Sequence, residues 1–279
     1  MHPLYYTIKE SLSDVYADLE CEALAKWILT DIFGLSAACL YAGKDTDFSE
    51  SDQLRLADIL QRLKSYEPLQ YITGNTPFCG LTFKVTPDVL IPRPETGELV
   101  CWIAENHLQP GLRVLDIGTG SGCIAVSLGR MLPEAKITGW DISAKVLAVA
   151  KENALSNGVE ADFRQVDILA GSLPEFRADI LVSNPPYVTE KEKAEMEPNV
   201  LDWEPSLALF VPDDDPLRFY RRIATVGRDI LLPGGTLYFE INRMYGQDIV
   251  NMLKEAGYIS VELKKDLSHN DRMIKAVRP

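Results

Sequence analysis

Between residues 112 and 241 the sequence alternates short apolar runs with amphipathic stretches. The apolar runs occupy residues 112–118, 136–142, 162–168, 178–184 and 235–241, and the amphipathic stretches that separate several of them occupy residues 122–132, 144–158 and 216–231. Apolar strands connected by helices form a largely parallel sheet that helices cover on both faces. Right-handed crossovers then place a ligand crevice at the carboxyl ends of the strands. We therefore predict an α/β fold for this half of the chain.

The amino-terminal part has helical spacing instead. Residues 14–34 repeat apolar side chains such as Leu19 at three- and four-residue intervals, and residues 49–64 do so with Leu54 on the apolar stripe and a serine cap. Residues 78–89 change to strand spacing, with Gly80 at a turn. We predict a small all-α domain over residues 1–76, a β-hairpin linker over 77–92 and the domain with the parallel sheet over 93–279.

The chain is strongly acidic, with 28 Lys and Arg against 41 Asp and Glu and a formal net charge of −13. Proteins bind nucleic acids largely by neutralising phosphates, which requires a basic face. The densest cationic cluster, residues 218–222, is explained more simply as an exposed helix face. The composition therefore favours a protein as the large partner.

Several other classes of site and location are disfavoured. The 5 cysteines never have C-x-x-C spacing and the 3 histidines lie far apart, so neither a metal site nor a Ser-His-Asp triad is expected. No run approaches the roughly 20 apolar residues of a membrane span, and the first residues lack the order of a secretion signal. We expect a cytoplasmic protein without a bound metal.

A glycine-rich turn follows the first apolar run of the α/β half. The segment VLDIGTGSG (residues 114–122) places Asp116 at a strand end, with Gly118, Gly120 and Gly122 before a helix. Glycines at such a turn let the backbone approach a ligand and leave N–H groups free at the helix start. The spacing differs from the dinucleotide pattern G-x-G-x-x-G, and no Lys-Ser/Thr follows as in a phosphate loop.

Polar side chains recur where the next strands end. Asp141 ends the second strand, where a carboxylate can accept both hydroxyls of a ribose. Asp167 and Ile168 end the third strand and can supply an acceptor and an apolar wall for adenine, and Asn184 follows the fourth strand. One such residue is usually a cap or turn residue, but their recurrence at successive strand ends predicts a shared crevice.

The fourth strand runs directly into two prolines, in the segment DILVSNPPYV (residues 179–188). Each proline lacks an N–H and has a fixed φ, so the pair cannot continue a sheet ladder and leaves its carbonyls free to accept hydrogen bonds. Proline after a strand is also common as simple punctuation. These residues alone leave both explanations open.

The whole series, D-x-G-x-G-x-G, acids at the next two strand ends and N-P-P-Y, resembles the class I S-adenosylmethionine-dependent methyltransferases that act on planar NH2 groups. Other segments are similar to the HemK/PrmC family, the protein-(glutamine-N5) methyltransferases of peptide chain release factors. These segments are PLQYITG (68–74), VLIPRPET (89–96), DIGTGSGCIA (116–125), VSNPPYV (182–188) and WEPSLAL (203–209). The resemblance spans nearly the full chain and implies a Rossmann-like domain with a mostly parallel seven-stranded sheet, preceded by a helical substrate-recognition domain.

The resemblance also implies a reaction and its residues. S-adenosylmethionine would donate a methyl group to the side-chain amide of the glutamine in the Gly-Gly-Gln loop of class 1 release factors. Catalysis and substrate binding would fall to Asn184, Pro185, Pro186 and Tyr187. Cofactor binding would fall to Asp116, Gly118, Thr119, Gly120, Ser121, Gly122, Asp141, Ile142, Asp167, Ile168 and Asn184. The enzyme would act as a monomer, without direct contact to nucleic acid or membrane.

Amide chemistry then explains the proline pair. A planar amide nitrogen is a poor nucleophile because its lone pair is delocalised, so it must be held in line with the methyl group. The Asn184 side-chain oxygen and the Pro185 carbonyl can each accept one N–H of the substrate, and Tyr187 can lie against the flat face of the amide. No general base is assigned.

An adenine-N6 methyltransferase of DNA or RNA is the alternative, because N-P-P-Y suits any planar NH2 group. The lack of a basic recognition domain argues against it. The chain also departs from the family pattern: Gly97 replaces an acid, Asn242 and His269 replace glycines, and Ile168 replaces an aromatic residue.

Overall fold

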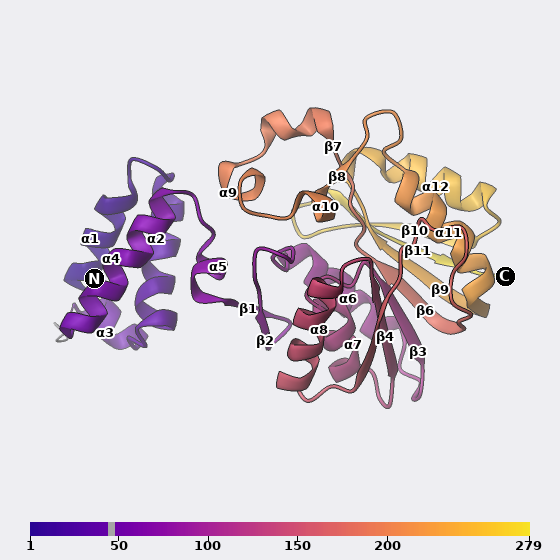
Figure 1. The fold of residues 1–279 in the computed structure, drawn as a ribbon, viewed down its shortest axis with the longest axis horizontal. Helices are drawn as coiled ribbons and strands as arrows, with labels where there is room; N and C mark the ends of the chain where they lie inside the picture. The colour runs from indigo at the N-terminus through magenta and orange to yellow at the C-terminus, as the bar shows by residue number, and fades with distance from the viewer. Residues whose placement is uncertain (44–47) are drawn as a thin grey trace. The chain divides into compact units, whose positions relative to one another are not determined.

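The computed structural model describes residues 1–43 and 48–279, which divide into two compact units (Figure 1). One unit consists of Met1–Gly74 and Glu197–Trp203, and the other consists of Asn75–Met196 and Glu204–Pro279. A short downstream segment therefore belongs to the helical unit. The domain boundaries expected from the sequence, after residues 76 and 92, stay predictions.

The helical unit is built from short helices around one apolar core. Ile8, Leu12, Ile28 and Leu63 are among its fully or almost fully buried side chains. Its elements are α1 (Pro3–Leu12), α2 (Asp18–Trp27), the π-helical turn η1 (Ile28–Ile32), α3 (Ala37–Ala42), α4 (Glu50–Lys64), α5 (Leu69–Thr73) and the downstream α9 (Pro198–Leu201).

The predicted apolar stripes of this unit are partly wrong. Leu19 is 81% exposed and Leu54 is 68% exposed. The buried face of α2 instead presents the small side chains of Cys21 and Ala25, which a search for large apolar residues overlooks. The expected serine cap of α4 is confirmed, because Ser49 Oγ accepts a hydrogen bond from the backbone N–H three residues on, at 3.1 Å.

The second unit contains a seven-stranded sheet with the order β10-β11-β9-β6-β3-β4-β5. The strands β3 (Arg113–Ile117), β4 (Lys136–Asp141), β5 (Ala161–Gln165), β6 (Ala178–Ser183) and β9 (Leu231–Glu240) pair in parallel, whereas β11 (Asp271–Val277) is antiparallel to both β9 and β10 (Ile259–Lys265). The strand order reverses beside β3, since β4 lies on one side of β3 and β6 on the other. The predicted mostly parallel sheet is confirmed.

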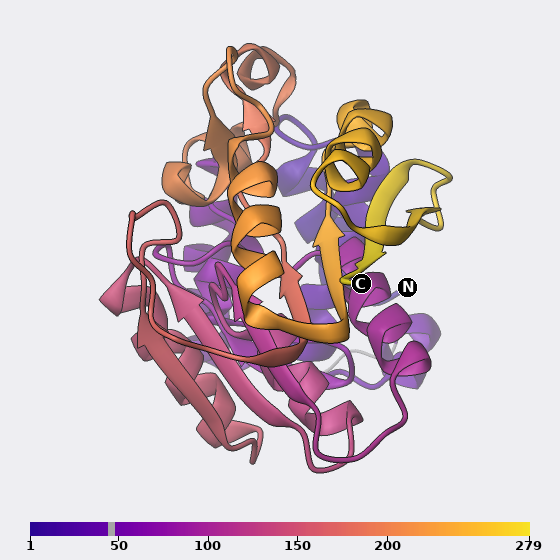
Figure 2. The ribbon, with the colours of Figure 1, turned by 90° about the vertical axis from the view of Figure 1, so that its right-hand side faces the viewer.

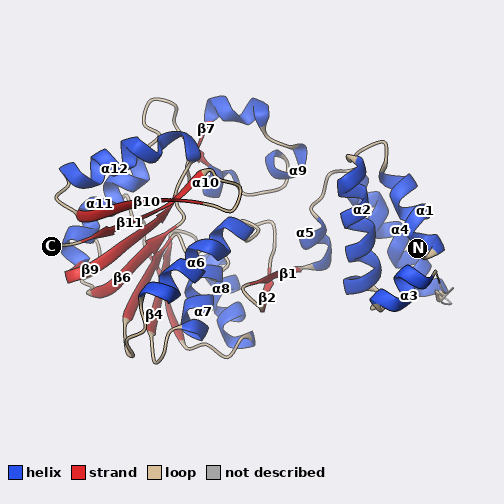
Figure 3. Cartoon of the chain, turned by 180° about the vertical axis from the view of Figure 1, so that it is seen from behind, coloured by secondary structure: helices blue, strands red, loops and turns tan. Residues whose placement is uncertain are grey.

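Helices cover both faces of this sheet, as its alternating side chains require (Figures 1 and 2). Val114 and Ile180 pack with α6 (Pro94–Asn106), α7 (Cys123–Met131) and α8 (Ala144–Ser156), which lie together on one face in Figure 3. Leu115 and Leu181 point to the other face and pack with α11 (Arg218–Ile230) and α12 (Gly246–Glu255). Within residues 1–43 and 48–279, no helix combines the length and apolar character that crossing a membrane requires.

Smaller elements complete the second unit. The hairpin of β1 (Asn75–Phe78) and β2 (Leu81–Lys84) turns at Gly80, whose φ of +75° is one that glycine adopts without strain. Two short strands, β7 (Val188–Thr189) and β8 (Phe210–Val211), pair in parallel. The remaining elements are η2 (Glu190–Glu195), α10 (Ser206–Leu209) and η3 (Arg243–Tyr245).

Gly139 on β4 has no room for a side chain. An added Cβ would lie 2.6 Å from Phe163 Cδ1 and 2.8 Å from Thr119 Oγ1. Because overpacking costs about 1–3 kcal/mol, we expect Gly139→Ala to lower the thermal unfolding midpoint by roughly 3–10 °C, as measured by circular dichroism. The control is Gly171→Ala, where no described heavy atom lies within 4 Å of the added Cβ. Equal midpoints for the two variants would contradict the expectation.

Candidate active site

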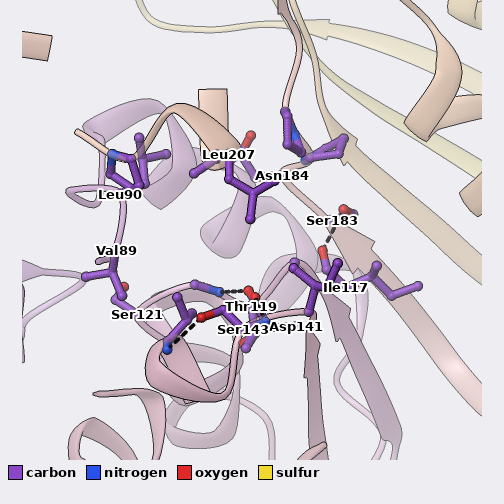
Figure 4. A pocket seen from close by; sticks show the side chains of 18 of the residues that line it. Val89, Leu90, Ile117, Thr119, Ser121, Asp141, Ser143, Ser183, Asn184 and Leu207 are labelled. Carbon is purple, nitrogen blue, oxygen red and sulfur yellow. Dashed lines mark hydrogen bonds between the residues drawn. The ribbon is translucent and has the colours of Figure 1, made fainter. Parts of the chain in front are cut away.

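A cavity of about 430 Å³ lies at the carboxyl ends of the parallel strands (Figure 4). Its walls include residues 117–121 from the end of β3, 141–143 from the end of β4, 166–169 after β5 and 183–186 from the end of β6. All of its lining residues belong to the second unit. Successive strand ends therefore meet in one crevice, beside the point where the strand order reverses.

The glycine-rich turn forms the floor of the cavity. Gly118 and Gly120 have φ of +71° and +55°, and a Cβ added at Gly118 would meet no described atom within 4 Å. However, the N–H groups of Gly118 and Thr119 donate to Trp140 O, that of Gly120 to Asp141 and that of Gly122 to Thr119 O. We expected the N–H groups of this turn to be free for a ligand, and this is wrong for these four N–H groups. The glycines instead allow a backbone conformation with positive φ and leave space beside the turn.

Asp141 projects from the end of β4 toward the turn, as Figure 4 shows. Its Oδ2 accepts from Gly120 N at 3.1 Å and its Oδ1 from Ser143 N at 3.0 Å. Burial raises the pKa of this carboxyl, and the hydrogen bonds that it accepts from backbone N–H groups oppose that rise. Each oxygen keeps a lone pair for a further donor.

Asp116, Gly122 and Tyr187 are the predicted site residues that, among the described residues, do not line the cavity. Asp116 is fully buried, and its Oδ2 accepts from Thr119 Oγ1 at 2.7 Å, while its Oδ1 has no hydrogen-bond partner among the residues described. An added Cβ at Gly122 would lie 3.2 Å from Ala150 Cβ, so this glycine permits close packing of α7 on α8. These residues do not line the cavity themselves, but they hold or pack against the segments that do.

The other predicted residues lie where the sequence places them. Asn184, Pro185 and Pro186 line the cavity on the β6 side, and Ile142, Asp167 and Ile168 line it after β4 and β5. Figure 4 shows Asn184 beside Leu207 and across from the glycine-rich turn. Ser183 Oγ donates to Ile117 O at 2.7 Å, which joins the end of β6 to the end of β3.

A buried network behind Asn184 was not anticipated from the sequence. Asn184 Nδ2 donates to Thr96 Oγ1 at 3.4 Å, Thr96 Oγ1 donates to Glu240 Oε2 at 2.6 Å, and Tyr187 OH donates to Glu240 Oε1 at 3.2 Å. Burial raises the pKa of Glu240, and the Thr96 hydroxyl, the Arg272 guanidinium and the Tyr187 hydroxyl oppose this rise.

Two loops close the cavity and were also missed as site elements. Residues 87–93 and Pro205, Leu207 and Ala208 line it. Glu204 connects these loops, because its buried carboxylate pairs with Arg93 and accepts from Ile91 N at 3.2 Å. The segments VLIPRPET and WEPSLAL were singled out by resemblance only. An acid within a proline-containing loop is the signal in the sequence that could have identified them.

The geometry fits no metal centre in the described part of the chain, where no group of three or more His, Cys, Asp or Glu is placed to hold an ion. The sheet order, the glycine turn after β3, the acid after β4 and the Asn-Pro-Pro segment after β6 together define a class I S-adenosylmethionine-dependent methyltransferase. A solved methyltransferase from Pyrococcus furiosus shares the fold, with a TM-score of 0.53 and 17% identity over 82% of this chain and 99% of that chain.

Comparisons of sequence identify the family. Residues 8–74 match the family described as PrmC N-terminal domain, and residues 99–201 match the Methyltransferase small domain. Release factor glutamine methyltransferase of Bacteroides thetaiotaomicron is 52% identical over 97% of this chain and 98% of its own length. The protein of the same name from Flavobacterium psychrophilum is 43% identical over 95% of both chains. The chain belongs to the release factor glutamine methyltransferase family.

Asp116 should make the second unit less stable as pH rises. Burial raises its pKa from an ordinary value of 3.8 to about 7. A carboxyl with a raised folded pKa contributes stability that is complete below the unfolded pKa and is lost as pH rises through the folded pKa. Between pH 4 and 7 we expect the wild type to lose roughly 4 kcal/mol relative to Asp116→Asn, which does not titrate. Urea unfolding at a series of pH values measures this difference.

The comparison with Asp116→Asn is needed because burial also raises the pKa of Asp141, Glu204 and Glu240. Asp214→Asn, at an exposed position, should keep the wild-type pH profile. Parallel profiles for the wild type and Asp116→Asn would show that Asp116 is ionised in the folded protein at neutral pH.

Proposed function

We propose that this protein transfers a methyl group from S-adenosylmethionine to the side-chain amide nitrogen of the Gly-Gly-Gln glutamine in class 1 peptide chain release factors. The observation that carries the proposal is that Asn184 and Pro185 line the same cavity as Asp141 and the glycine-rich turn. Family membership supports the choice of substrate.

The cavity residues fit S-adenosylmethionine. The Asp141 oxygens can accept the two ribose hydroxyls with their remaining lone pairs. Ile142 and Ile168 provide apolar contacts for adenine, and the carboxylates of Asp88, Asp141 and Asp167 around the cavity suit a ligand that carries a sulfonium and an ammonium group. When bound, this cofactor supplies a methyl group that is activated by its attachment to a positively charged sulfur.

Asn184 and Pro185 are proposed to hold the substrate amide. The β6 ladder ends at Ser183, so the Pro185 carbonyl lies beyond the ladder and its ring cannot extend the pairing. Asn184 Oδ1 and Pro185 O would each accept one N–H of the glutamine, which aligns the nitrogen with the methyl group and increases its electron density. Such positioning can contribute roughly 7 kcal/mol.

Pro186 and Tyr187 complete the proposed site. Pro186 lines the cavity, and Tyr187 is proposed to contact the flat face of the amide once the glutamine is bound. The nitrogen becomes acidic only after the new C–N bond forms. No lining residue is therefore assigned as a general base.

The helical unit is proposed to bind the release factor away from its Gly-Gly-Gln loop. A net charge of −13 favours a protein partner and disfavours direct nucleic-acid binding. We further propose that the enzyme acts as a monomer in the cytoplasm, where release factors work.

Asn184→Ala should abolish most methyl transfer because the substrate amide loses one of its two acceptors. We expect a decrease in kcat of about 100-fold or more, by analogy with the loss of one preorganised hydrogen bond in an active site. Peptide mass spectrometry of a release factor incubated with the enzyme and S-adenosylmethionine would detect a single methyl on the loop glutamine.

Two controls accompany that experiment. A release factor whose loop glutamine is replaced should stay unmethylated, and Asn251→Ala, at an exposed position on α12, should keep wild-type activity. Transfer to adenine in DNA or RNA, with none to the release factor, would overturn the proposed substrate and support the nucleic-acid alternative.

Asp141→Ala should weaken cofactor binding. Hydrogen bonds to a charged group contribute about 1.5–3 kcal/mol, so we expect the Kd for S-adenosylmethionine to rise about 10-fold to 100-fold in isothermal titration calorimetry. Asp214→Ala, at an exposed position, is the matched control. An unchanged Kd for Asp141→Ala would mean that the ribose does not bind at this carboxylate.

A further inference from the structure

The hydrogen-bond chain behind Asn184 joins three separate elements. Asn184 follows β6, Thr96 lies in the first turn of α6 and Glu240 ends β9. Thr96 and Glu240 are each only 2% exposed, and Thr96 also lines the cavity. The chain therefore leads from a buried carboxylate to the side chain that the proposed function uses as an acceptor.

The order of donors along this chain is determined by its chemistry. Glu240 accepts one hydroxyl at each of its two carboxyl oxygens, Thr96 Oγ1 at Oε2 and Tyr187 OH at Oε1. A threonine hydroxyl has a single hydrogen, so Thr96, which donates to Glu240, can only accept from Asn184. The Asn184 group that faces Thr96 must then be the NH2 group, and its oxygen is directed away from Thr96.

Other contacts hold this end of β9 in place. Tyr220 OH donates to Glu240 O at 3.3 Å, and Asn242 Nδ2 donates to Tyr187 O at 3.2 Å. Arg272, whose Nε donates to Asp266 Oδ2 at 3.1 Å, carries a positive charge that opposes the rise in the pKa of Glu240 caused by burial. The Glu240 side chain is thus fixed in position between two hydroxyl donors, and the carbonyl of the same residue is held by Tyr220.

We propose that Thr96 and Glu240 are positioning residues that fix the orientation of the Asn184 amide, with its oxygen presented to the substrate. The inference rests on the proposed function and goes beyond it. The two ends of an amide have nearly the same shape, so packing alone does not select one orientation. A flipped Asn184 would present N–H groups to the N–H groups of the glutamine, and methyl transfer would lose an acceptor.

Thr96→Val tests this role because valine has the shape of threonine without its hydroxyl. In this variant the Asn184 NH2 group loses the acceptor that it has at Thr96 Oγ1 in the productive orientation. We expect kcat for methylation of a class 1 release factor to fall about 10-fold to 100-fold, with the Kd for S-adenosylmethionine unchanged. Thr96→Ser, which keeps the hydroxyl, should restore kcat.

Glu240→Gln provides a second, isosteric variant that does not depend on Thr96→Val folding well. A glutamine has an NH2 group in place of one carboxyl oxygen, so the hydroxyls of Thr96 and Tyr187 no longer both have to donate to it. We therefore expect kcat to fall in this variant too. The double variant should lose little more than Thr96→Val alone, because both changes act through one hydrogen-bond chain. Thr236→Val, a buried position earlier on β9, should keep wild-type kcat.

The outcomes separate the two proposals. A wild type that methylates no release factor overturns the proposed function and this inference with it. An active wild type with Thr96→Val and Glu240→Gln within twofold of its kcat overturns the positioning role alone. Loss of cofactor affinity in parallel with kcat, failure of Thr96→Ser to restore kcat, or additive losses in the double variant would show a merely structural role and would also overturn it.

Discussion

The parallel pairing of β3 with both β4 and β6 is the constraint on which the rest of the structure depends. β3 is a central strand of the sheet. The next two strands in the chain, β4 and β5, lie on one side of it, and the later strand β6 lies on the other side. The turn after β3 therefore has a strand end on each side, Asp141 on one and Asn184 on the other. Ser183 Oγ, bonded to Ile117 O, joins two of these ends directly. The proposed cofactor subsite and the proposed amide subsite thus open into one cavity.

Acidic side chains in and behind the cavity hold its segments in one arrangement. The carboxylates of Asp141, Glu204 and Glu240 accept from groups that are distant in sequence, whereas that of Asp116 accepts from the Thr119 hydroxyl three residues on. Removing such groups from water is costly unless they are paired. Each carboxylate therefore makes one arrangement of its neighbouring segments much more favourable than others, and the cost appears as raised pKa values.

Local patterns in the sequence were sufficient to predict the sheet, its helices and the strand-end residues. Apolar runs, glycine turns and Asn-Pro-Pro-Tyr are each encoded within a few residues, and parallel topology brings the strand ends together without further information. Thr96 and Glu240 were missed because their contact joins residues 144 positions apart in sequence. Leu19 was misplaced for a related reason, since which side of α2 is buried depends on the helices that pack against it.

His269 and Asn242 show how the fold accommodates side chains at two positions where the resemblance implies glycine. His269 has a φ of +65°, and its N–H donates to Asp266 O in the turn between β10 and β11. The Asn242 side chain donates to Tyr187 O and to Glu192. Tyr187 is therefore held at its backbone by Asn242 and at its hydroxyl by Glu240. Since Glu240 also accepts from the Thr96 hydroxyl, Asn242 contacts the same network that is proposed to orient Asn184.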